Sequence, residues 1–190
     1  MQDSELIKNV LEGRQQDFSL LVKKYQQPVF RTANGFVHHT ADAEEITQDV
    51  FLKAFFKLSS FNGKAAFSTW LYRITVNVSI NFLKKKKRSQ FWTGLSTLLQ
   101  LASNDKNAEM MLVEKSQKQL IEQAIDQLPL KQRTAFVLSK YEELPQKEVA
   151  AVMHITEGAV EQLVIRAKTN LKKNLEKELA GHRMFSESGV

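Results

Sequence analysis

Residues 67–77 read FSTWLYRITVN, and the same segment continues to KKKKR at residues 84–88. Leu71, Ile74 and Val78 recur at the spacing of one helical face, which predicts a helix from about residue 68 to residue 87 with Trp70 packed on it. Nine Lys and Arg but no acidic residue occur between Asp49 and Asp105. A positive segment with aromatic and amide side chains suits a nucleic acid whose bases are unstacked. For the lysine run alone, a solvated basic helix is the usual interpretation, and the aromatic residues before the run favour nucleic-acid binding.

Composition narrows the class of protein. The 190-residue chain has no cysteine, which excludes disulfides, Cys-ligated zinc and thiol catalysis. Its net charge of +6 lies in the first half, because residues 1–90 carry 14 Lys and Arg against 8 Asp and Glu. This asymmetry indicates a polyanionic partner for that half. No apolar run approaches the roughly 18–20 residues that span a bilayer, and the acidic N-terminus is unlike a secretory signal. We expect a cytoplasmic protein without stable membrane insertion.

The remaining chain also has helical periodicity, and no strand-like alternation of any length occurs. Asp17 and Asp42 are placed to cap the helices that follow them. Phe61-Asn62-Gly63 indicates a turn, and residues 89–104 carry no charge, which is typical of a linker. The sequence predicts an all-α protein with a first domain at 1–90, a linker at 91–115, a second domain at 116–180 and a tail at 181–190.

Residues 144–178 have the pattern of a helix-turn-helix. Pro145 suits the first turn of one helix, and Thr156 suits the N-cap of the next. Ala150 and Ala151 are small residues at the place where two such helices cross. An ordinary helical hairpin is the alternative interpretation of this motif taken alone.

An acidic helix precedes the basic one. Asp42, Glu45 and Asp49 lie three and four residues apart and share one face. This face fits a solvated surface, a docking surface anchored by Ile46 or Phe51, or the acidic pair of a nucleic-acid hydrolase. Enzymatic chemistry is disfavoured because no His follows these acids at helical spacing and no Gly-rich phosphate loop or nucleophile motif occurs. We expect no enzymatic activity, no metal and no cofactor.

Polar side chains on the predicted basic helix are candidates to contact a ligand. Hydroxyl and amide groups can read base edges, and Arg can stack on a base or hold a phosphate. These candidates are Ser68, Thr69, Tyr72, Arg73, Asn77 and Asn81.

Together these motifs resemble, in the same order, the conserved regions of bacterial sigma factors. Residues 42–54 (DAEEITQDVFLKA) are similar to region 2.2, and residues 61–63 with 67–77 are similar to regions 2.3 and 2.4. Leu128-Pro129 with Arg133, followed by residues 144–171, resembles region 4. The plan of two domains is similar to the extracytoplasmic-function (ECF) subgroup, and the resemblance covers about residues 5–178.

The resemblance implies a factor that binds core RNA polymerase and directs promoter recognition, melting and transcription initiation. It implies docking on the β′ clamp helices by Asp42, Glu45, Ile46, Gln48, Asp49 and Phe51. It implies contacts with the minus-ten element by Phe61, Asn62, Gly63, Ser68, Thr69, Arg73, Asn77, Lys84 and Lys85. It implies contacts with the minus-35 element by Thr156, Glu157, Gly158, Glu161, Gln162, Ile165, Arg166 and Lys168, with the same domain on the β flap. The subgroup also implies an anti-sigma factor as a partner.

One segment departs from the family pattern. Glu161-Gln162-Leu163 follows Val160 where Lys and Arg are usual, so either the base preference differs or this half contributes less affinity. Glu161 can accept from a cytosine amino group or can be a solvated surface residue. A stand-alone helix-turn-helix regulator of duplex DNA is the alternative function, but it leaves the acidic helix and the aromatic–basic segment without a role.

Overall fold

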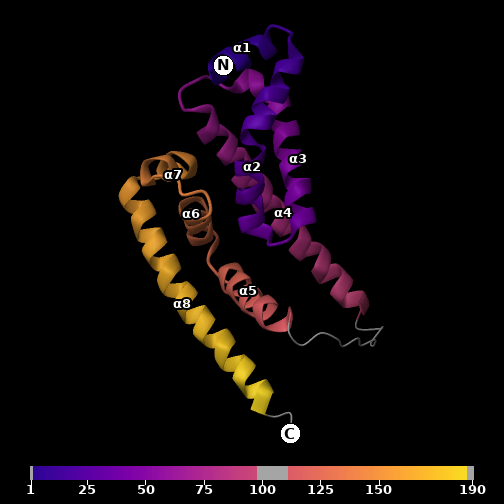
Figure 1. The fold of residues 1–190 in the computed structure, drawn as a ribbon, viewed down its shortest axis with the longest axis vertical. Helices are drawn as coiled ribbons and strands as arrows, with labels where there is room; N and C mark the ends of the chain where they lie inside the picture. Colours follow the sequence, from indigo (N-terminus) through magenta and orange to yellow (C-terminus); the bar gives the residue numbers. More distant parts are fainter. Residues whose placement is uncertain (1, 98–110, 188–190) are drawn as a thin grey trace.

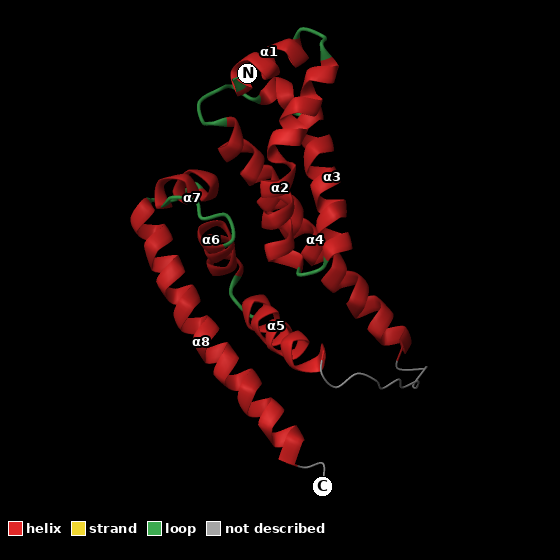
Figure 2. Ribbon diagram, in the orientation of Figure 1, coloured by secondary structure: helices red, strands yellow, loops and turns green. Residues whose placement is uncertain are grey.

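The computed structural model describes residues 2–97 and 111–187. Within these ranges every regular element is helical and no strand occurs, which confirms the predicted all-α class (Figure 2). The described helices form two groups, α1–α4 and α5–α8, that lie beside one another (Figure 1). No helix in the two ranges is both long and apolar enough to cross a membrane.

The first domain consists of α1 (Asp3–Leu11), α2 (Phe18–Val37), α3 (Thr40–Phe56) and α4 (Phe67–Thr97). The three long helices pack around an apolar core in which Leu21, Ile46 and Leu71 are at most 1% exposed. Each of these residues comes from a different helix, so the core fixes the relative positions of α2, α3 and α4. The helix predicted at 68–87 is therefore confirmed, and it is longer at its C-terminal end.

Asp17 occupies the predicted N-cap position of α2, but its side chain does not cap the helix, because its carboxylate accepts a hydrogen bond from Asn9 Nδ2 at 2.7 Å. The predicted N-cap at Asp42 is wrong. His39, not Asp42, precedes α3. Its backbone is extended, as N-cap residues usually are, and its Nδ1 accepts the backbone N–H of Asp42 at 3.3 Å. Asp42 thus lies within the first turn, where its charge favours the helix dipole.

The second domain consists of α5 (Met111–Asp126), α6 (Leu130–Lys140), α7 (Gln146–Met153) and α8 (Glu157–Glu187). Pro145 directly precedes α7 and does not lie in its first turn. His154 ends α7 in the left-handed conformation with φ 54°, and Thr156 Oγ1 accepts from the Ala159 N–H at 3.3 Å. The predicted N-cap at Thr156 and the helix-turn-helix are confirmed.

Helices extend into the segments that were predicted as linker and tail. α4 continues to Thr97 and α5 begins at Met111, so both ends of the 91–115 segment are helical. Residues 98–110, which hold the middle of that predicted linker, lie outside the described residues. α8 continues to Glu187, into the segment predicted as a tail, and residues 188–190 also lie outside the described range.

The two domains share a second apolar core. Phe36 of α2 is fully buried, and with Val76 of α4 it belongs to a cluster that includes Val137 of α6 and Val149 of α7. Gly35 permits this approach, because a Cβ at that position would lie 2.9 Å from Val137 Cγ1. The second domain therefore rests on a surface formed by α2 and α4 of the first.

Candidate partner and nucleic-acid interfaces

One face of α3 is acidic at its start and apolar at its end. Glu45, Gln48 and Asp49 are exposed, and the same face continues to Leu52 (56% exposed) and Phe56 (77% exposed). These residues are three or four positions apart and therefore form one continuous surface. We call these five residues the α3 stripe. An apolar groove of about 610 Å³ between α2 and α3 adjoins the stripe at Gln48 and Leu52.

The apolar anchors predicted for this surface are buried. Ile46 is 0% exposed and Phe51 is 8% exposed, with its ring edge-on to Phe18 at 6.4 Å between centroids. Ile46 reaches no surface, whereas the edge of Phe51 lines the groove between α2 and α3. Leu52 and Phe56 are the exposed apolar side chains of this face, and the sequence carried a signal for them, because they follow Asp49 by three and seven residues on the acidic face.

Asp42 does not belong to the exposed stripe. Lys86 Nζ donates to Asp42 Oδ2 at 2.5 Å, and the Asp42 side chain is only 18% exposed. This ion pair links the start of α3 to the basic end of α4. The two partners are 44 positions apart in the sequence, so no local pattern shows their contact.

At the turn before α4 an aromatic ring packs against two others, and the residues that follow it in the turn are exposed. The Phe61 ring lies 5.6 Å from Phe67 and 5.5 Å from Trp70 between centroids. Asn62 Oδ1 accepts the Lys64 N–H at 3.1 Å, and Gly63 has φ +69°, a conformation that favours glycine. The predicted turn and the packed position of Trp70 are confirmed, and the exposed Asn62 side chain is held by its own local bond.

The predicted base-contacting residues of α4 are not all accessible. Thr69 is 5% exposed and Tyr72 is 8% exposed, so both face the protein interior, while Ser68 is half-buried. Asn77 is exposed and lines a cleft of about 480 Å³. Arg73 lines the same cleft, and it is already engaged: its Nη2 donates to the Ala151 carbonyl at 2.6 Å and its Nε donates to the same oxygen at 3.2 Å.

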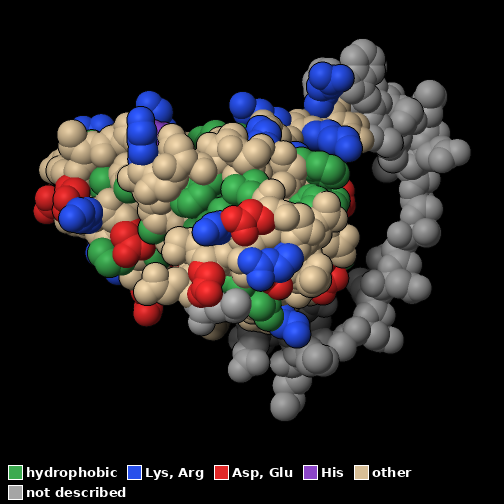
Figure 3. All heavy atoms as spheres, turned by 90° about the horizontal axis from the view of Figure 1, so that it is seen from above, with side chains coloured by type: hydrophobic (Ala, Val, Ile, Leu, Met, Phe, Trp, Pro, Cys, Tyr) green, Lys and Arg blue, Asp and Glu red, His purple; other side chains and the backbone are tan. Residues whose placement is uncertain are grey.

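Most of the lysine run is open to solvent. Lys84, Lys85, Lys87 and Arg88 are exposed, whereas Lys86 is paired with Asp42. In the space-filling view from above, several Lys and Arg side chains stand along the upper edge, and basic and acidic side chains are mixed on the face below it (Figure 3).

The first turns of α8 present every residue predicted for duplex DNA. All of them are exposed, with Ile165 at 49%, and the set is Thr156, Glu157, Gly158, Glu161, Gln162, Ile165, Arg166 and Lys168. Val160 and Ala167 are fully buried and fix the opposite face of the helix in the core. The helix is therefore held rigidly with its polar face outward.

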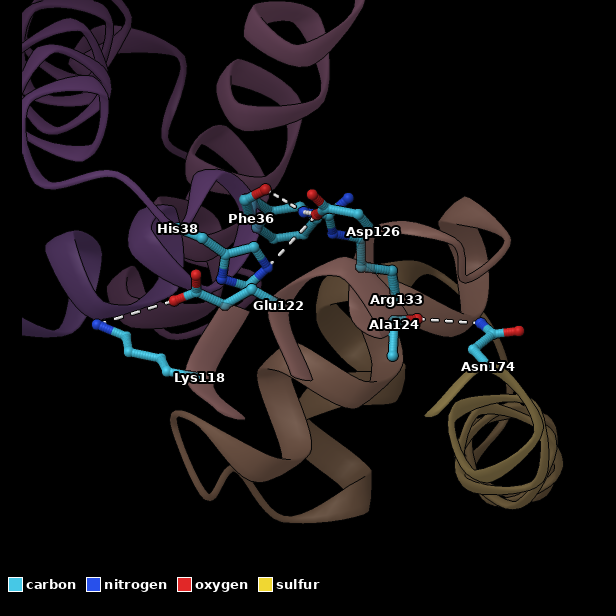
Figure 4. A network of polar contacts seen from close by, with 8 residues as sticks. All are labelled: Phe36, His38, Lys118, Glu122, Ala124, Asp126, Arg133 and Asn174. Atoms are coloured by element: carbon cyan, nitrogen blue, oxygen red, sulfur yellow. Dashed lines mark hydrogen bonds and ion pairs between the residues drawn. The ribbon is translucent and has the colours of Figure 1, made fainter. Parts of the chain in front are cut away.

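A partly buried polar network joins α2 to α5 and α6 (Figure 4). Arg133 donates to the Phe36 carbonyl and to Asp126 Oδ1, and His38 Nε2 lies 3.4 Å from the same carboxylate oxygen. Burial would raise the pKa of Asp126, but the hydrogen bond from His38 and the charge of Arg133 hold that pKa below its usual value. Burial lowers the pKa of Arg133, and Asp126 opposes this effect. The sequence motif around Arg133 does not predict this bond to the first domain, because Phe36 is 97 positions away.

A second polar group joins the domains at Glu142. Its side chain is 1% exposed and accepts from Arg31 Nε at 3.2 Å, Arg31 Nη2 at 3.0 Å and the Tyr72 hydroxyl at 3.2 Å. Burial raises the pKa of the Glu142 carboxyl, and its bonds to Arg31 and Tyr72 act in the opposite direction. Burial and the neighbouring carboxylate raise the pKa of Tyr72, which keeps its hydroxyl a donor.

Comparison with known proteins places this arrangement in a family. Residues 21–89 match Sigma-70 region 2, and residues 118–171 match Sigma-70, region 4. The chain is 32% identical over 186 residues to the RNA polymerase sigma-H factor of Pseudomonas aeruginosa, covering 92% of this chain and 94% of that protein. It is 31% identical to the ECF RNA polymerase sigma factor SigW of Bacillus subtilis, covering 89% and 94%, and 31% identical to the ECF RNA polymerase sigma-E factor of Escherichia coli, covering 87% and 90%.

Two solved structures share the fold. CnrH, in complex with the cytosolic domain of CnrY, superposes with a TM-score of 0.68 at 22% identity, covering 92% of this chain and 97% of that one. The sigma factor RpoE of Bartonella quintana, in complex with the anti-sigma factor NepR, superposes with a TM-score of 0.59 at 22% identity, covering 84% and 97%.

The chain therefore belongs to the sigma-70 family, and within it to the ECF RNA polymerase sigma factors. It is a transcription initiation factor that binds core RNA polymerase and promoter DNA, and it is not an enzyme.

Proposed function

We propose that the chain uses three separate surfaces, each with its own binding partner, in transcription initiation. The α3 stripe docks on the β′ clamp helices of core polymerase, the turn at Phe61-Asn62-Gly63 with α4 captures unpaired minus-ten bases, and the first turns of α8 read the minus-35 element. The observation that carries this proposal is that accessible side chains of the right chemistry occur on all three surfaces, each on a helix held by a buried core.

The α3 stripe has the composition of a docking surface. Carboxylates at Glu45 and Asp49 suit a basic partner and steer its approach, whereas the exposed Leu52 and Phe56 supply apolar area that a partner can bury. A purely solvated acidic face would not need a side chain as large and as exposed as Phe56. The buried Ile46 and Phe51 support the stripe from below.

The surface that we propose for base capture combines contacts with base edges and contacts with phosphates. Asn77 and Asn62 offer exposed amides that can pair with base edges, and Arg73 can stack on a base or hold a phosphate once it is released from Ala151. Lys84 and Lys85 lie further along α4 and can hold the backbone of the same strand. Extruding a base costs a few kcal/mol, so contacts made only with the extruded base favour melted DNA.

The surface of α8 is suited to base pairs in a major groove. Gln162 can bond to adenine N6 and N7, and Glu161 can accept from cytosine N4. Arg166 and Lys168 can neutralise phosphates on either side. We assign contacts with the β flap to the same domain.

The cellular setting follows from the partners. Core RNA polymerase and promoter DNA are in the bacterial cytoplasm, so we place the protein there. The relation to RpoE, which was solved with the anti-sigma factor NepR, suggests that an anti-sigma factor also controls this chain.

Co-purification with core polymerase tests the proposed docking. A tagged chain is mixed with purified core enzyme, and the complex is measured by gel filtration. We expect a stoichiometric complex with the native chain, and its absence would contradict the function assigned to the α3 stripe.

Replacement of Asn77 by Ala is expected to lower open-complex formation about tenfold while leaving core binding unchanged. The amide is exposed on α4, and one good pair of base contacts is worth about 1–3 kcal/mol. Permanganate footprinting of the melted region measures the first quantity, and titration with core polymerase measures the second. An equal loss of both would indicate misfolding instead of a lost base contact.

Replacement of Lys84 and Lys85 by Ala is expected to flatten the salt dependence of promoter binding. Each phosphate contact contributes roughly 0.7–0.9 to the slope of log K against log salt, so the pair should reduce that slope by between one and two. Binding of the holoenzyme is measured at several salt concentrations. The exposed pair Lys172 and Lys173, outside the assigned surfaces, is the control, and equal slopes for the two double variants would contradict the phosphate assignment.

A further inference from the structure

The first helix of the chain, α1, takes no part in the three surfaces assigned above. It ends before residue 21, where the match to Sigma-70 region 2 begins. In Figure 1 it lies at the same end of the first domain as the turn that precedes α4. It also contacts the 3-10 helix Leu58–Ser60, which directly precedes Phe61 and that turn. α1 is therefore a neighbour of the segment that we assign to base capture.

Polar contacts fix both ends of α1. Near its start, Asp3 accepts hydrogen bonds from Lys24 Nζ at 2.6 Å and from the Tyr25 hydroxyl. Near its end, the buried Asn9 side chain donates to Asp17 Oδ2 at 2.7 Å. Between these contacts one face of the helix is buried in the core of the first domain. The position of α1 along α2 is thus defined at two points, and the first of them includes an aromatic ring.

The Tyr25 ring extends the contact with Asp3 to the aromatic residues beside the turn. It lies edge-on to Phe67 with 5.5 Å between ring centroids, which is a favourable arrangement for two aromatic rings. Phe67 is 4% exposed and lies 5.6 Å from the Phe61 ring, also edge-on. Phe61 is the first residue of the turn. A continuous row of contacts therefore leads from Asp3 on α1 to the turn itself.

The hydrogen bond to Asp3 fixes the direction of the Tyr25 ring. A carboxylate is a strong acceptor, and the hydroxyl of a partly buried tyrosine usually has a partner. Burial and the hydrogen bond to Asp3 raise the pKa of Tyr25 to about 12, so the hydroxyl remains a donor at neutral pH. With one end of the ring bound to α1, its other edge has a defined position against Phe67. Loss of this bond would leave the ring in the core and free its orientation.

The tip of the turn has little support of its own. Asn62 and Gly63 are exposed, and a Cβ at Gly63 would meet no atom of the described chain within 4 Å. The turn is attached to the core through Phe61, which is half-buried and packs on Phe67. Groups that bind a ligand specifically must be held within about 0.5 Å of their productive position. The accuracy of base capture at this turn therefore depends on the residues that support Phe61.

We propose that Asp3 and Tyr25 are positioning residues for base capture. Through Phe67 and Phe61 they hold the turn in the position that receives an unpaired minus-ten base, and neither of them contacts the DNA. This inference rests on the function proposed for the turn. The packing of its aromatic residues can nevertheless be measured in the free chain, without polymerase or DNA.

The first measurement is the accessibility of Trp70 in the free, full-length chain. The Trp70 ring lies 5.5 Å from Phe61 and 5.5 Å from Phe67 between centroids, so its fluorescence reports on this packing. The chain has two tryptophans, and a Trp92→Phe background leaves Trp70 as the only one. Variants that loosen the turn should increase quenching of this fluorescence by acrylamide, with unchanged helicity by circular dichroism.

Two substitutions break the bond from opposite sides. Asp3→Ala removes the acceptor, Tyr25→Phe removes the donor but keeps the ring, and both are expected to increase quenching. Asp3→Asn keeps an oxygen that can accept the Tyr25 hydroxyl and loses only an exposed ion pair with Lys24, which is worth little, so it should keep the parent value. Glu5→Ala removes another acidic residue from the first turn of α1, at an exposed position, and is the matched control.

The second measurement is the contribution of one base to DNA binding by the holoenzyme. Single-stranded oligonucleotides with the non-template sequence of a mapped promoter are compared with copies from which a single minus-ten base is removed. At the position where the parent chain loses most affinity, the ratio of the two affinities measures base capture. Asp3→Ala and Tyr25→Phe should lower this ratio about threefold to tenfold, which is at most the worth of a good base contact. A general loss of stability or of core binding weakens binding of both oligonucleotides and leaves the ratio unchanged.

The outcomes separate the positioning role from the function that it serves. Parent-like quenching in both Asp3→Ala and Tyr25→Phe would overturn the positioning role, and so would equal effects of Asp3→Ala and Glu5→Ala. Increased quenching with an unchanged affinity ratio would overturn the link to base capture. A parent chain that binds every base-deleted copy as tightly as the complete oligonucleotide would instead contradict the function proposed for the turn, and the quenching would still show whether Asp3 and Tyr25 position it.

Discussion

Replacing Asp49 by Lys is expected to weaken binding to core polymerase by about 2–4 kcal/mol, or roughly 30-fold to several hundred-fold. Asp49 lies at the centre of the α3 stripe, exposed between Glu45 and Leu52. A lysine there places a positive charge against a basic partner, and a like charge in such a contact costs several kcal/mol. Phe56→Ala should produce a loss of similar size, because large exposed aromatic residues are frequent anchors of interfaces.

The affinity is measured by titrating labelled protein with core enzyme, and helicity is checked by circular dichroism. Glu44→Lys is the matched control, since it makes the same charge change at an exposed position of α3 outside the stripe. Equal losses at residues 44 and 49 would show that net charge alone matters. Undiminished affinity of a well-folded Asp49→Lys chain would remove the stripe from the docking surface.

Replacing Ile46 by Ala is expected to lower the free energy of unfolding by about 2–5 kcal/mol. Ile46 is completely buried between the long helices, so truncation leaves a cavity that the core cannot fully close. Leu52→Ala should change stability by only about 0.5 kcal/mol, because that side chain is 56% exposed, and should weaken core binding instead.

Urea denaturation of the two variants gives the comparison directly. The pair is informative because residue type does not distinguish the two positions: both are aliphatic and both lie on α3. A destabilisation at Leu52 as large as that at Ile46 would mean that the stripe is part of the core, and it would withdraw Leu52 from the docking surface.

The features that were predicted correctly from the sequence depend on residues that are close to one another along the chain. Apolar periodicity predicted the helices of both domains, and Thr156 caps α8 because the capping bond spans only three residues. The turn at Asn62 and Gly63 was equally clear, since its geometry depends on the residues themselves. The resemblance to sigma factors then indicated which function each of these elements has.

The sequence did not predict the orientation of some side chains or the contacts between residues that are far apart along the chain. α3 has apolar residues around most of its circumference, so Phe51 and Phe56 could not be assigned to inside and outside from their types. Arg73 and Ala151 are 78 residues apart, and Arg31 and Glu142 are 111 apart, so no local pattern foretells either contact. Thr69 and Tyr72 have groups that could bind DNA, yet packing turns them inward.

Reconstituted transcription tests the central claim most directly. Start sites are mapped after overexpression of the chain, and a mapped promoter is transcribed in vitro by core polymerase with or without the purified protein. We predict transcripts that start at the mapped site only when the protein is present, with little affinity of the free chain for the duplex alone. Tight, sequence-specific binding of the free chain to that duplex, with no promoter-dependent transcript, would contradict the account and favour a stand-alone helix-turn-helix regulator.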